Sequence, residues 1–128
     1  MRKFLLKAAQ ELCKTIREIA YAIHLYLGHG HMEKVYENAL ALRLKKAGLK
    51  IKRQYPVNVY EEDGTLIGEY FVDLLAEDCL LLELKTCQQL NNEHKLQILG
   101  YLKSTKIKDG LLINFGSYKF QIRKFIVG

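Results

Sequence analysis

Apolar and polar residues follow a helical period over the first part of the chain. Nine apolar positions between residues 4 and 27 fall on one side of a helix: Leu5, Ala8, Ala9, Leu12, Ile16, Ile19, Ala20, Ile23 and Leu27. Gly28 and Gly30 break this pattern, and a second helical period runs from about Met32 to Ala47, just before Gly48. Because glycine commonly ends helices, the pattern predicts two helices separated by a short loop that contains glycine.

The middle of the chain changes to the period of two that is typical of strands. Four strands are predicted here, over residues 49–54, 57–60, 66–76 and 80–86. The Asp63-Gly64 pair is a strong hairpin signal between the second and third of these segments, and Gly68 is a candidate bulge. Residues 77–79 predict a tight turn between the third and fourth.

The C-terminal part predicts one more helix and two more strands, over residues 91–105, 110–115 and 119–127. Asn91 or Asn92 is a suitable N-cap for the helix. His94 and Lys95 stand three residues further on, where a capping box would need glutamate or glutamine, so we expect no capping box. The order α-α-β-β-β-β-α-β-β predicts an α+β fold, an α/β sandwich with a mixed central sheet flanked by helices.

The size and composition are those of one small globular domain over residues 1–128. Apolar residues make up 49% of the chain and charged residues 27%, and charge interrupts each apolar run before it reaches a membrane-spanning length. Lys7 and Glu11 likewise interrupt the opening segment, so we expect no export signal. The three cysteines have no Cys-x-x-Cys spacing, which favours reduced thiols in a cytoplasmic protein.

Two acidic residues lie symmetrically about Asp78 in the predicted turn, because Asp73 precedes it by five residues and Glu83 follows it by five. If Asp78 centres the turn, the two acids are directly opposite on antiparallel strands, with Cβ atoms roughly 4.5–5.5 Å apart. Strand alternation then places Asp73, Glu83 and Lys85 on one face of the sheet. The other face is apolar and consists of Val72, Leu74, Ala76, Leu80, Leu82 and Leu84.

Two like charges opposite each other in a sheet are unfavourable, so one acid must keep its proton or a cation must lie between them. Mg²⁺ and Mn²⁺ prefer oxygen ligands of this kind, together with water or phosphate. Lys85 leaves two alternatives: it neutralises the acids itself, or it contacts a phosphate and positions an attacking water. The spacing alone does not decide between a structural ion pair and a catalytic site.

Other candidate residues also have simple structural explanations. Glu33 falls in the first turn of the second predicted helix, where the helix dipole favours an acid. His94, Gln97 and Tyr101 form a polar stripe on the third predicted helix, which either bonds acids and phosphate or is a solvated edge. The net charge is +6, and residues 101–128 hold six basic residues against one acid. Such a basic end suits a phosphate-backbone ligand, although for a charge run alone a solubility surface is the simpler explanation.

Taken together, these residues resemble the GxxExxY proteins, a family within the PD-(D/E)xK nuclease superfamily. The signature of that family is matched by Gly30-His31-Met32-Glu33-Lys34-Val35-Tyr36. The resemblance continues in order through Gln54-Tyr55-Pro56, Asp73-Leu74-Leu75, Glu83-Leu84-Lys85, His94-x-x-Gln97, Tyr101-Leu102-Lys103 and Gly110-Leu111-Leu112-Ile113-Asn114-Phe115-Gly116. A single Glu-x-Lys is weak evidence, but the whole ordered set is specific.

The resemblance implies a metal-dependent nuclease that hydrolyses phosphodiester bonds, with DNA as the expected substrate. It implies that Asp73, Glu83 and the backbone carbonyl of Leu84 bind Mg²⁺ or Mn²⁺, and that Lys85 is the catalytic lysine. Glu33 and Gln97 complete the implied catalytic set from the helices before and after the sheet hairpin. Four further residues are expected nucleic-acid contacts: Tyr36, His94, Tyr101 and Lys103. By analogy we also expect a homodimer, and no membrane association.

Two other functions remain open. The first is an accessory or nucleic-acid-binding module that keeps the nuclease-like fold without catalysis, which the small size favours and the paired acids disfavour. The second is a structural or interaction protein in which Lys85 bridges the acids. His29 and His31, with His24 nearby, raise the question of zinc, but two loop histidines are insufficient for a site and no cysteine is near them in sequence.

Overall fold

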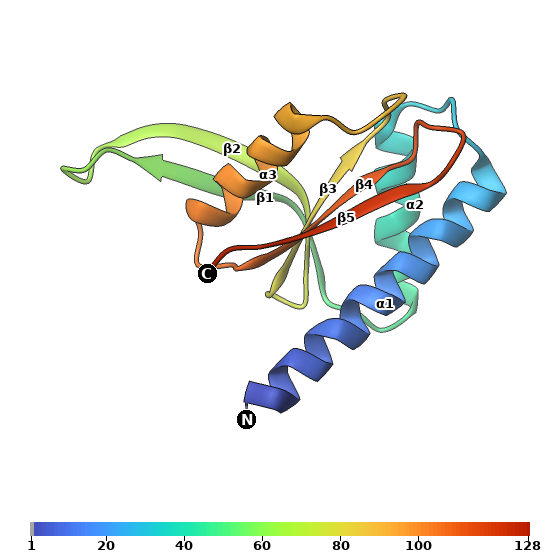
Figure 1. Ribbon diagram of the computed structural model, residues 1–128, viewed down its shortest axis with the longest axis horizontal. Helices are drawn as coiled ribbons and strands as arrows, with labels where there is room; N and C mark the ends of the chain where they lie inside the picture. Colours follow the sequence, from blue (N-terminus) through green and yellow to red (C-terminus); the bar gives the residue numbers. More distant parts are fainter. Residues whose placement is uncertain (1) are drawn as a thin grey trace.

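The structure, a computed structural model, describes residues 2–128, with side chains from residue 8 onward. In this part of the chain the elements are α1 (Arg2–Leu27), α2 (Glu33–Lys46), β1 (Ile51–Tyr60), β2 (Leu66–Ala76), β3 (Leu80–Lys85), α3 (Asn92–Lys103), β4 (Asp109–Asn114) and β5 (Gln121–Ile126). The fold is α+β with a mixed sheet flanked by helices, as predicted (Figure 1).

One strand replaces the two that were predicted over residues 49–60. β1 runs without interruption through Tyr55-Pro56, so the predicted break there is wrong. Because β1 is an edge strand whose neighbour is β2, Pro56 is tolerated although it cannot donate a ladder hydrogen bond. The irregularity instead lies at Gln54, which has a φ of 50° and drops out of the ladder opposite Asp73.

The five strands lie in the order β1-β2-β3-β4-β5, and β3–β4 is the parallel pair among antiparallel neighbours. Lys85 at the end of β3 is opposite Asn114 at the end of β4. The carboxyl ends of these two strands therefore lie side by side at one end of the sheet, and α3 supplies the crossover between them. The loop that precedes α2 and the loops that follow β3 and β4 lie together at this end of the strands (Figure 1).

Two hydrophobic clusters cover the two faces of the sheet. α1 and α2 pack on one face, against the buried side chains of Leu74, Ala76, Leu80, Leu82, Leu84, Leu111 and Ile113. α3 packs on the other face through Tyr101 and Leu102 (Figure 1). Val72 was expected beside Leu74 but belongs to the α3 cluster. The ladder is interrupted at Asp73, between these two residues, so simple alternation does not carry across it.

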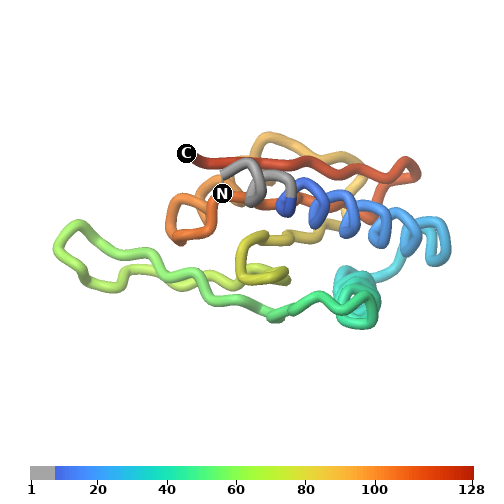
Figure 2. Tube along the Cα trace, turned by 90° about the horizontal axis from the view of Figure 1, so that it is seen from below, coloured from blue at the N-terminus to red at the C-terminus, as the bar shows by residue number. Residues whose placement is uncertain are grey.

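The hairpin formed by β1 and β2 reaches beyond the helices, and Figure 2 shows it extending away from the rest of the molecule. Its turn carries Glu61, Glu62 and Asp63, so its tip is acidic. At the other extreme, α1 buries Ile16 and Ile23 against the sheet and exposes charged residues on its outer side. Among the helices that the structure describes, none is long and apolar enough to cross a membrane.

Candidate active site

The turn between β2 and β3 sets the register of the two acids. Leu74 pairs with Leu82 and Ala76 with Leu80, so the hairpin is symmetric about Asp78, as predicted. The ladder ends at the Leu74–Leu82 pair, and the next step of the same register holds Asp73 and Glu83. The sequence prediction of two opposed acids is therefore confirmed for the register, at the point where backbone pairing stops.

Side-chain hydrogen bonds continue where the ladder ends. The backbone N–H of Leu84 donates to Oδ2 of Asp73 at 2.7 Å, and the backbone N–H of Asp73 lies 3.4 Å from Oε1 of Glu83. Both acids are buried, with exposed fractions of 9% for Asp73 and 5% for Glu83. The carboxylates thus take positions that backbone carbonyls occupy in an ordinary ladder, which brings them together between the two strands.

The charges of this pair are not balanced by an ion pair. The salt bridges found among the described side chains involve Glu37 and Asp78 as their acids, and neither Asp73 nor Glu83. Burial, together with the hydrogen bond and negative charge of Asp73, raises the pKa of Glu83 to about 9. Two adjacent buried carboxylates therefore share a proton in the absence of a cation, or a cation replaces that proton.

Lys85 does not bridge the acids. Its Nζ donates to Oε1 of Gln97 on α3 at 2.8 Å, while its positive charge only moderates the raised pKa of Glu83. Lys85 is half-buried and Gln97 is exposed, so the ammonium group remains accessible to a ligand at the carboxyl end of β3. The described side chains therefore do not form the direct bridge from Lys85 to the two acids that was left open as an alternative.

The backbone carbonyl of Leu84 points toward the same gap as the acids. In a strand, the N–H and C=O of one residue point to the same side, and the Leu84 N–H points to Asp73. The carbonyl of Lys85 points the other way and accepts from the N–H of Phe115 at 2.9 Å. Two carboxylates and one carbonyl are oxygen ligands of the type that Mg²⁺ and Mn²⁺ prefer, so this donor set fits a hard divalent cation.

Glu33 is the first residue of α2 and is exposed. Partial burial and the nearby negative charge of Asp73 raise its pKa, and the positive charge of Lys85 opposes this rise. Glu33 therefore lies within electrostatic range of the acidic pair. It does not complete a three-acid centre, because within residues 8–128 no three His, Cys, Asp or Glu side chains converge as a metal-binding group.

Tyr36 was expected to contact nucleic acid, and the structure places it in the core. Its side chain is fully buried and stacks on Phe115, with ring centroids 4.8 Å apart. Its hydroxyl donates to the carbonyl of Gly28 at 2.5 Å and accepts from the N–H of His31 at 3.2 Å. Tyr36 therefore holds the loop between α1 and α2 against the core and offers no surface to a ligand.

The other expected nucleic-acid contacts lie on α3. His94 closes a capping box, because its Nδ1 accepts from the N–H of Asn91 while Asn91 accepts from the N–H of His94. The expectation of no capping box is wrong, since a neutral histidine nitrogen accepts a bond as glutamate does. Tyr101 is buried, and burial and the charge of Glu83 raise its pKa to about 12. Lys103 is exposed in the last turn of α3.

No three His, Cys, Asp or Glu side chains converge around the histidines before α2, in the part of the chain with described side chains. His24 is buried, and its Nε2 donates to the carbonyl of Ser117 at 2.8 Å. His29 and His31 are exposed in the loop, and each ring packs edge-on against a tyrosine.

Glu37 is a supporting residue that the sequence did not single out. It is buried, and its carboxylate accepts bonds from Lys34, Arg53 and Gln54. Burial raises its pKa, but the bonds from Arg53 and Lys34 outweigh burial and lower it. Glu37 thus fixes the irregular part of β1 that faces Asp73. Its position four residues after Glu33, on the same side of α2, was the available signal.

Asn114 is a second supporting residue that was missed. Its fully buried amide accepts from the N–H groups of Cys87 and Gly116 and donates to the carbonyl of Cys87 and to Gln121. These bonds tie the loop after β3 to the loop after β4, directly behind Lys85. An asparagine at the end of an apolar strand was the signal in the sequence.

The mixed sheet, flanked by helices, brings Asp73 of β2 beside Glu83 and Lys85 of β3. The sequence matches the PD-(D/E)XK nuclease superfamily over residues 10–125, and the chain belongs to this superfamily. No curated protein matches the chain in a sequence search.

Among solved structures, one described as the crystal structure of SSO0001 superposes with a TM-score of 0.61 at 17% sequence identity. The likeness covers 83% of this chain and 52% of that chain, so the protein spans about half the length of the structure it matches. At this identity the comparison supports the fold alone.

Proposed function

We propose that the protein is a metal-dependent nuclease of the GxxExxY type that hydrolyses phosphodiester bonds in DNA. The observation that carries the proposal is the buried pair of Asp73 and Glu83, which has no ion-pair partner among the described side chains. Membership of the PD-(D/E)XK nuclease superfamily supports it. Mg²⁺ or Mn²⁺ bound there would polarise the phosphate and lower the pKa of a bound water.

Each residue of the site has a distinct part in this proposal. Asp73, Glu83 and the carbonyl of Leu84 would hold the cation. Lys85 donates from Nζ to a phosphate oxygen or to the attacking water and stabilises the developing negative charge. Gln97 accepts a bond from the same ammonium group and orients it. Glu33, exposed at the start of α2 with a raised pKa, would donate a proton to the leaving oxygen or take one from the attacking water.

A cleavage assay with matched controls tests the proposal. Wild-type protein, Asp73→Ala and Lys85→Ala are incubated with labelled single-stranded and double-stranded DNA in Mg²⁺, in Mn²⁺ and in EDTA. Glu69→Ala and Lys95→Ala serve as controls, because each removes an exposed residue of the same charge, Glu69 from β2 and Lys95 from α3. We expect metal-dependent cleavage by the wild type and both controls, and none by the two site variants. Cleavage that survives both Asp73→Ala and Lys85→Ala would overturn the mechanism.

The competing function is a nucleic-acid-binding or accessory module without catalysis. One observation favours it: no third acid joins Asp73 and Glu83 among the described side chains. Calorimetric titration separates the two functions. A Mn²⁺ site that is lost in Asp73→Ala supports the nuclease, whereas metal-independent DNA binding without a metal site supports the module. The homodimer expected by analogy stays a prediction, which light scattering tests.

A further inference from the structure

A cavity of about 520 Å³ lies between the end of α1 and the loop that joins β4 to β5. Five aromatic rings and one cation form much of its wall: Tyr21, His24, His29, Tyr118, Phe120 and Lys119. No carboxylate is among the described residues that line it. Because β3 and β4 are parallel, the β4–β5 loop begins at the same end of the strands as the candidate active site.

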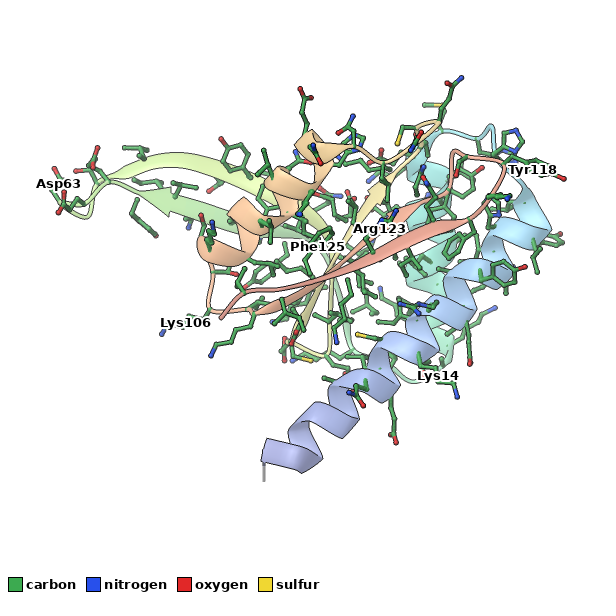
Figure 3. The ribbon with its side chains drawn as sticks, viewed as in Figure 1. Lys14, Asp63, Lys106, Tyr118, Arg123 and Phe125 are labelled. Carbon is green, nitrogen blue, oxygen red and sulfur yellow. The ribbon has the colours of Figure 1, made fainter. Side chains whose placement is uncertain are left out.

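Two rings of this cavity, those of Tyr118 and His29, are exposed. Tyr118 is 84% exposed, and its ring meets His29 edge-on, with centroids 6.2 Å apart and an interplanar angle of 82°. An edge-on contact leaves a ring face free for another flat group. Figure 3 shows Tyr118 at the end of the molecule where α1 ends, far from Asp63 at the acidic tip of the hairpin.

The wall of the cavity is held in place before any ligand arrives. His24 donates to the carbonyl of Ser117, which ties the β4–β5 loop to α1. On the other side, Asn114 ties the same loop to the segment after β3, and Gly116 lies so close that a Cβ would stand 2.3 Å from the carbonyl carbon of Thr86. A wall fixed on both sides reduces the ordering cost of binding.

We infer that this cavity binds an unstacked nucleobase from a single-stranded segment of nucleic acid, with the adjacent phosphate drawn to Lys119. The inference rests on the proposed nuclease function, because it names the form of substrate that reaches the acids. The volume of the cavity lies in the usual range of small-molecule sites. Aromatic faces beside a cation commonly bind single-stranded nucleic acid. Bases paired and stacked in a duplex cannot enter, so frayed, looped or single strands are preferred.

The charge distribution distinguishes this cavity from the exposed apolar surface of the β1–β2 hairpin. The β1–β2 hairpin also exposes large side chains, including Tyr60 and Ile67, but its tip carries Glu61, Glu62 and Asp63. A phosphate backbone is repelled by such a surface and attracted to a site that has a lysine and no acid.

Binding in EDTA tests the inference apart from cleavage. Fluorescence anisotropy compares a labelled 20-nucleotide DNA strand, the same RNA strand, a blunt DNA hairpin and a strand of equal length whose sugars carry no bases. We expect the base-bearing single strands to bind at least about five-fold more tightly than the duplex and the baseless strand. Whether DNA, RNA or both bind identifies the sugar.

Variants then assign the binding to the cavity. Tyr118→Ala and His29→Ala change exposed side chains and are expected to weaken single-strand binding at least about five-fold. Tyr26→Ala, an exposed tyrosine on α1 outside the cavity, is the matched control and leaves binding unchanged. Since the chain has no tryptophan, Tyr118→Trp adds a single tryptophan, whose emission, excited apart from that of the tyrosines, should fall when a base stacks on it.

The outcomes are separable from those of the cleavage assay. Equal binding of the baseless strand, or unchanged affinity in both alanine variants, overturns the base-binding inference even if Asp73→Ala abolishes cleavage. If the wild type does not cleave DNA but still binds single strands selectively in EDTA, the nuclease proposal is removed and the cavity remains a single-strand site. Quenching of Tyr118→Trp by the base-bearing strand and not by the baseless strand supports the inference.

Discussion

The ammonium group of Lys85 donates a hydrogen bond to the amide oxygen of Gln97 at 2.8 Å, and this bond joins the end of β3 to α3. Because the amide is neutral, it orients the ammonium group without cancelling its charge. A carboxylate at the same position would form an ion pair and compete with a phosphate for the lysine. The neutral partner therefore keeps the positive charge available beside the two acids.

This relationship predicts unequal effects of two substitutions on cleavage. Lys85→Met is expected to lower the single-turnover rate at saturating Mn²⁺ by about 100-fold or more, since it removes the group that stabilises developing charge. Gln97→Ala is expected to lower the rate by only about 10-fold, because it removes the orientation and not the charge. A wild-type rate in Gln97→Ala would contradict the orienting role of the amide.

The raised pKa of Glu83 predicts how stability depends on pH when no metal is present. Between the ordinary value of 4.5 and about 9, the folded protein holds a proton on Glu83 that the unfolded chain has lost. The stabilising contribution of this group is therefore complete below pH 4.5 and is lost as the pH rises toward 9, with a slope of at most about 1.4 kcal/mol per pH unit.

Urea unfolding in EDTA measures this effect by comparing the wild type with Glu83→Gln. The glutamine stays neutral at every pH, so the stability of the wild type relative to the variant should fall steadily between pH 5 and pH 9. A constant difference across this range would mean that Glu83 does not carry a raised pKa in the folded protein.

Removal of the Tyr36 hydroxyl should weaken the fold while the ring stays packed on Phe115. Tyr36→Phe loses the bond to the carbonyl of Gly28 and the bond from the N–H of His31, and leaves both groups to find new partners. We expect the free energy of unfolding to fall by about 1–3 kcal/mol. Tyr26→Phe, which alters an exposed ring, should change it by less than about 0.5 kcal/mol. Equal effects of the two variants would contradict a structural role for Tyr36.

Two glycines should respond to alanine in opposite directions. A Cβ at Gly116 would lie 2.3 Å from the Thr86 carbonyl carbon, so Gly116→Ala should lower the unfolding free energy by about 1–3 kcal/mol or more. Gly100 is exposed within α3 and has open space around it, so Gly100→Ala should raise stability by up to about 1 kcal/mol. Thermal unfolding of both variants checks the signs, and a stabilising Gly116→Ala would mean that the two loops are not in close contact.

The sequence was sufficient where the decisive interactions are local. The symmetry of Asp73 and Glu83 about Asp78 predicted the hairpin register, because a short turn fixes the pairing of its own strands. The same holds for the helix that begins after Asn91, whose cap is set by its own side chain. The identity of the cap partner was missed because the rule considered only glutamate and glutamine.

Interactions between distant segments could not be predicted from the pattern of apolar and polar residues. The burial of Tyr36 depends on Phe115, nearly eighty residues later in the chain, and no spacing rule connects them. The insertion of Asp73 between the strands, where it bonds Leu84, depends on the ladder stopping at that step. The choice of Gln97 and not an acid as the partner of Lys85 likewise needed the position of α3.

The parallel pairing of β3 with β4 has a consequence for the order in which the chain folds. The β2–β3 hairpin closes over three residues, whereas β4 reaches β3 only after a crossover through α3. Local contacts form faster than distant ones, so we expect the acids to meet early, before Gln97 arrives. During synthesis on the ribosome, the two acids thus come together before the element that completes their surroundings has been made.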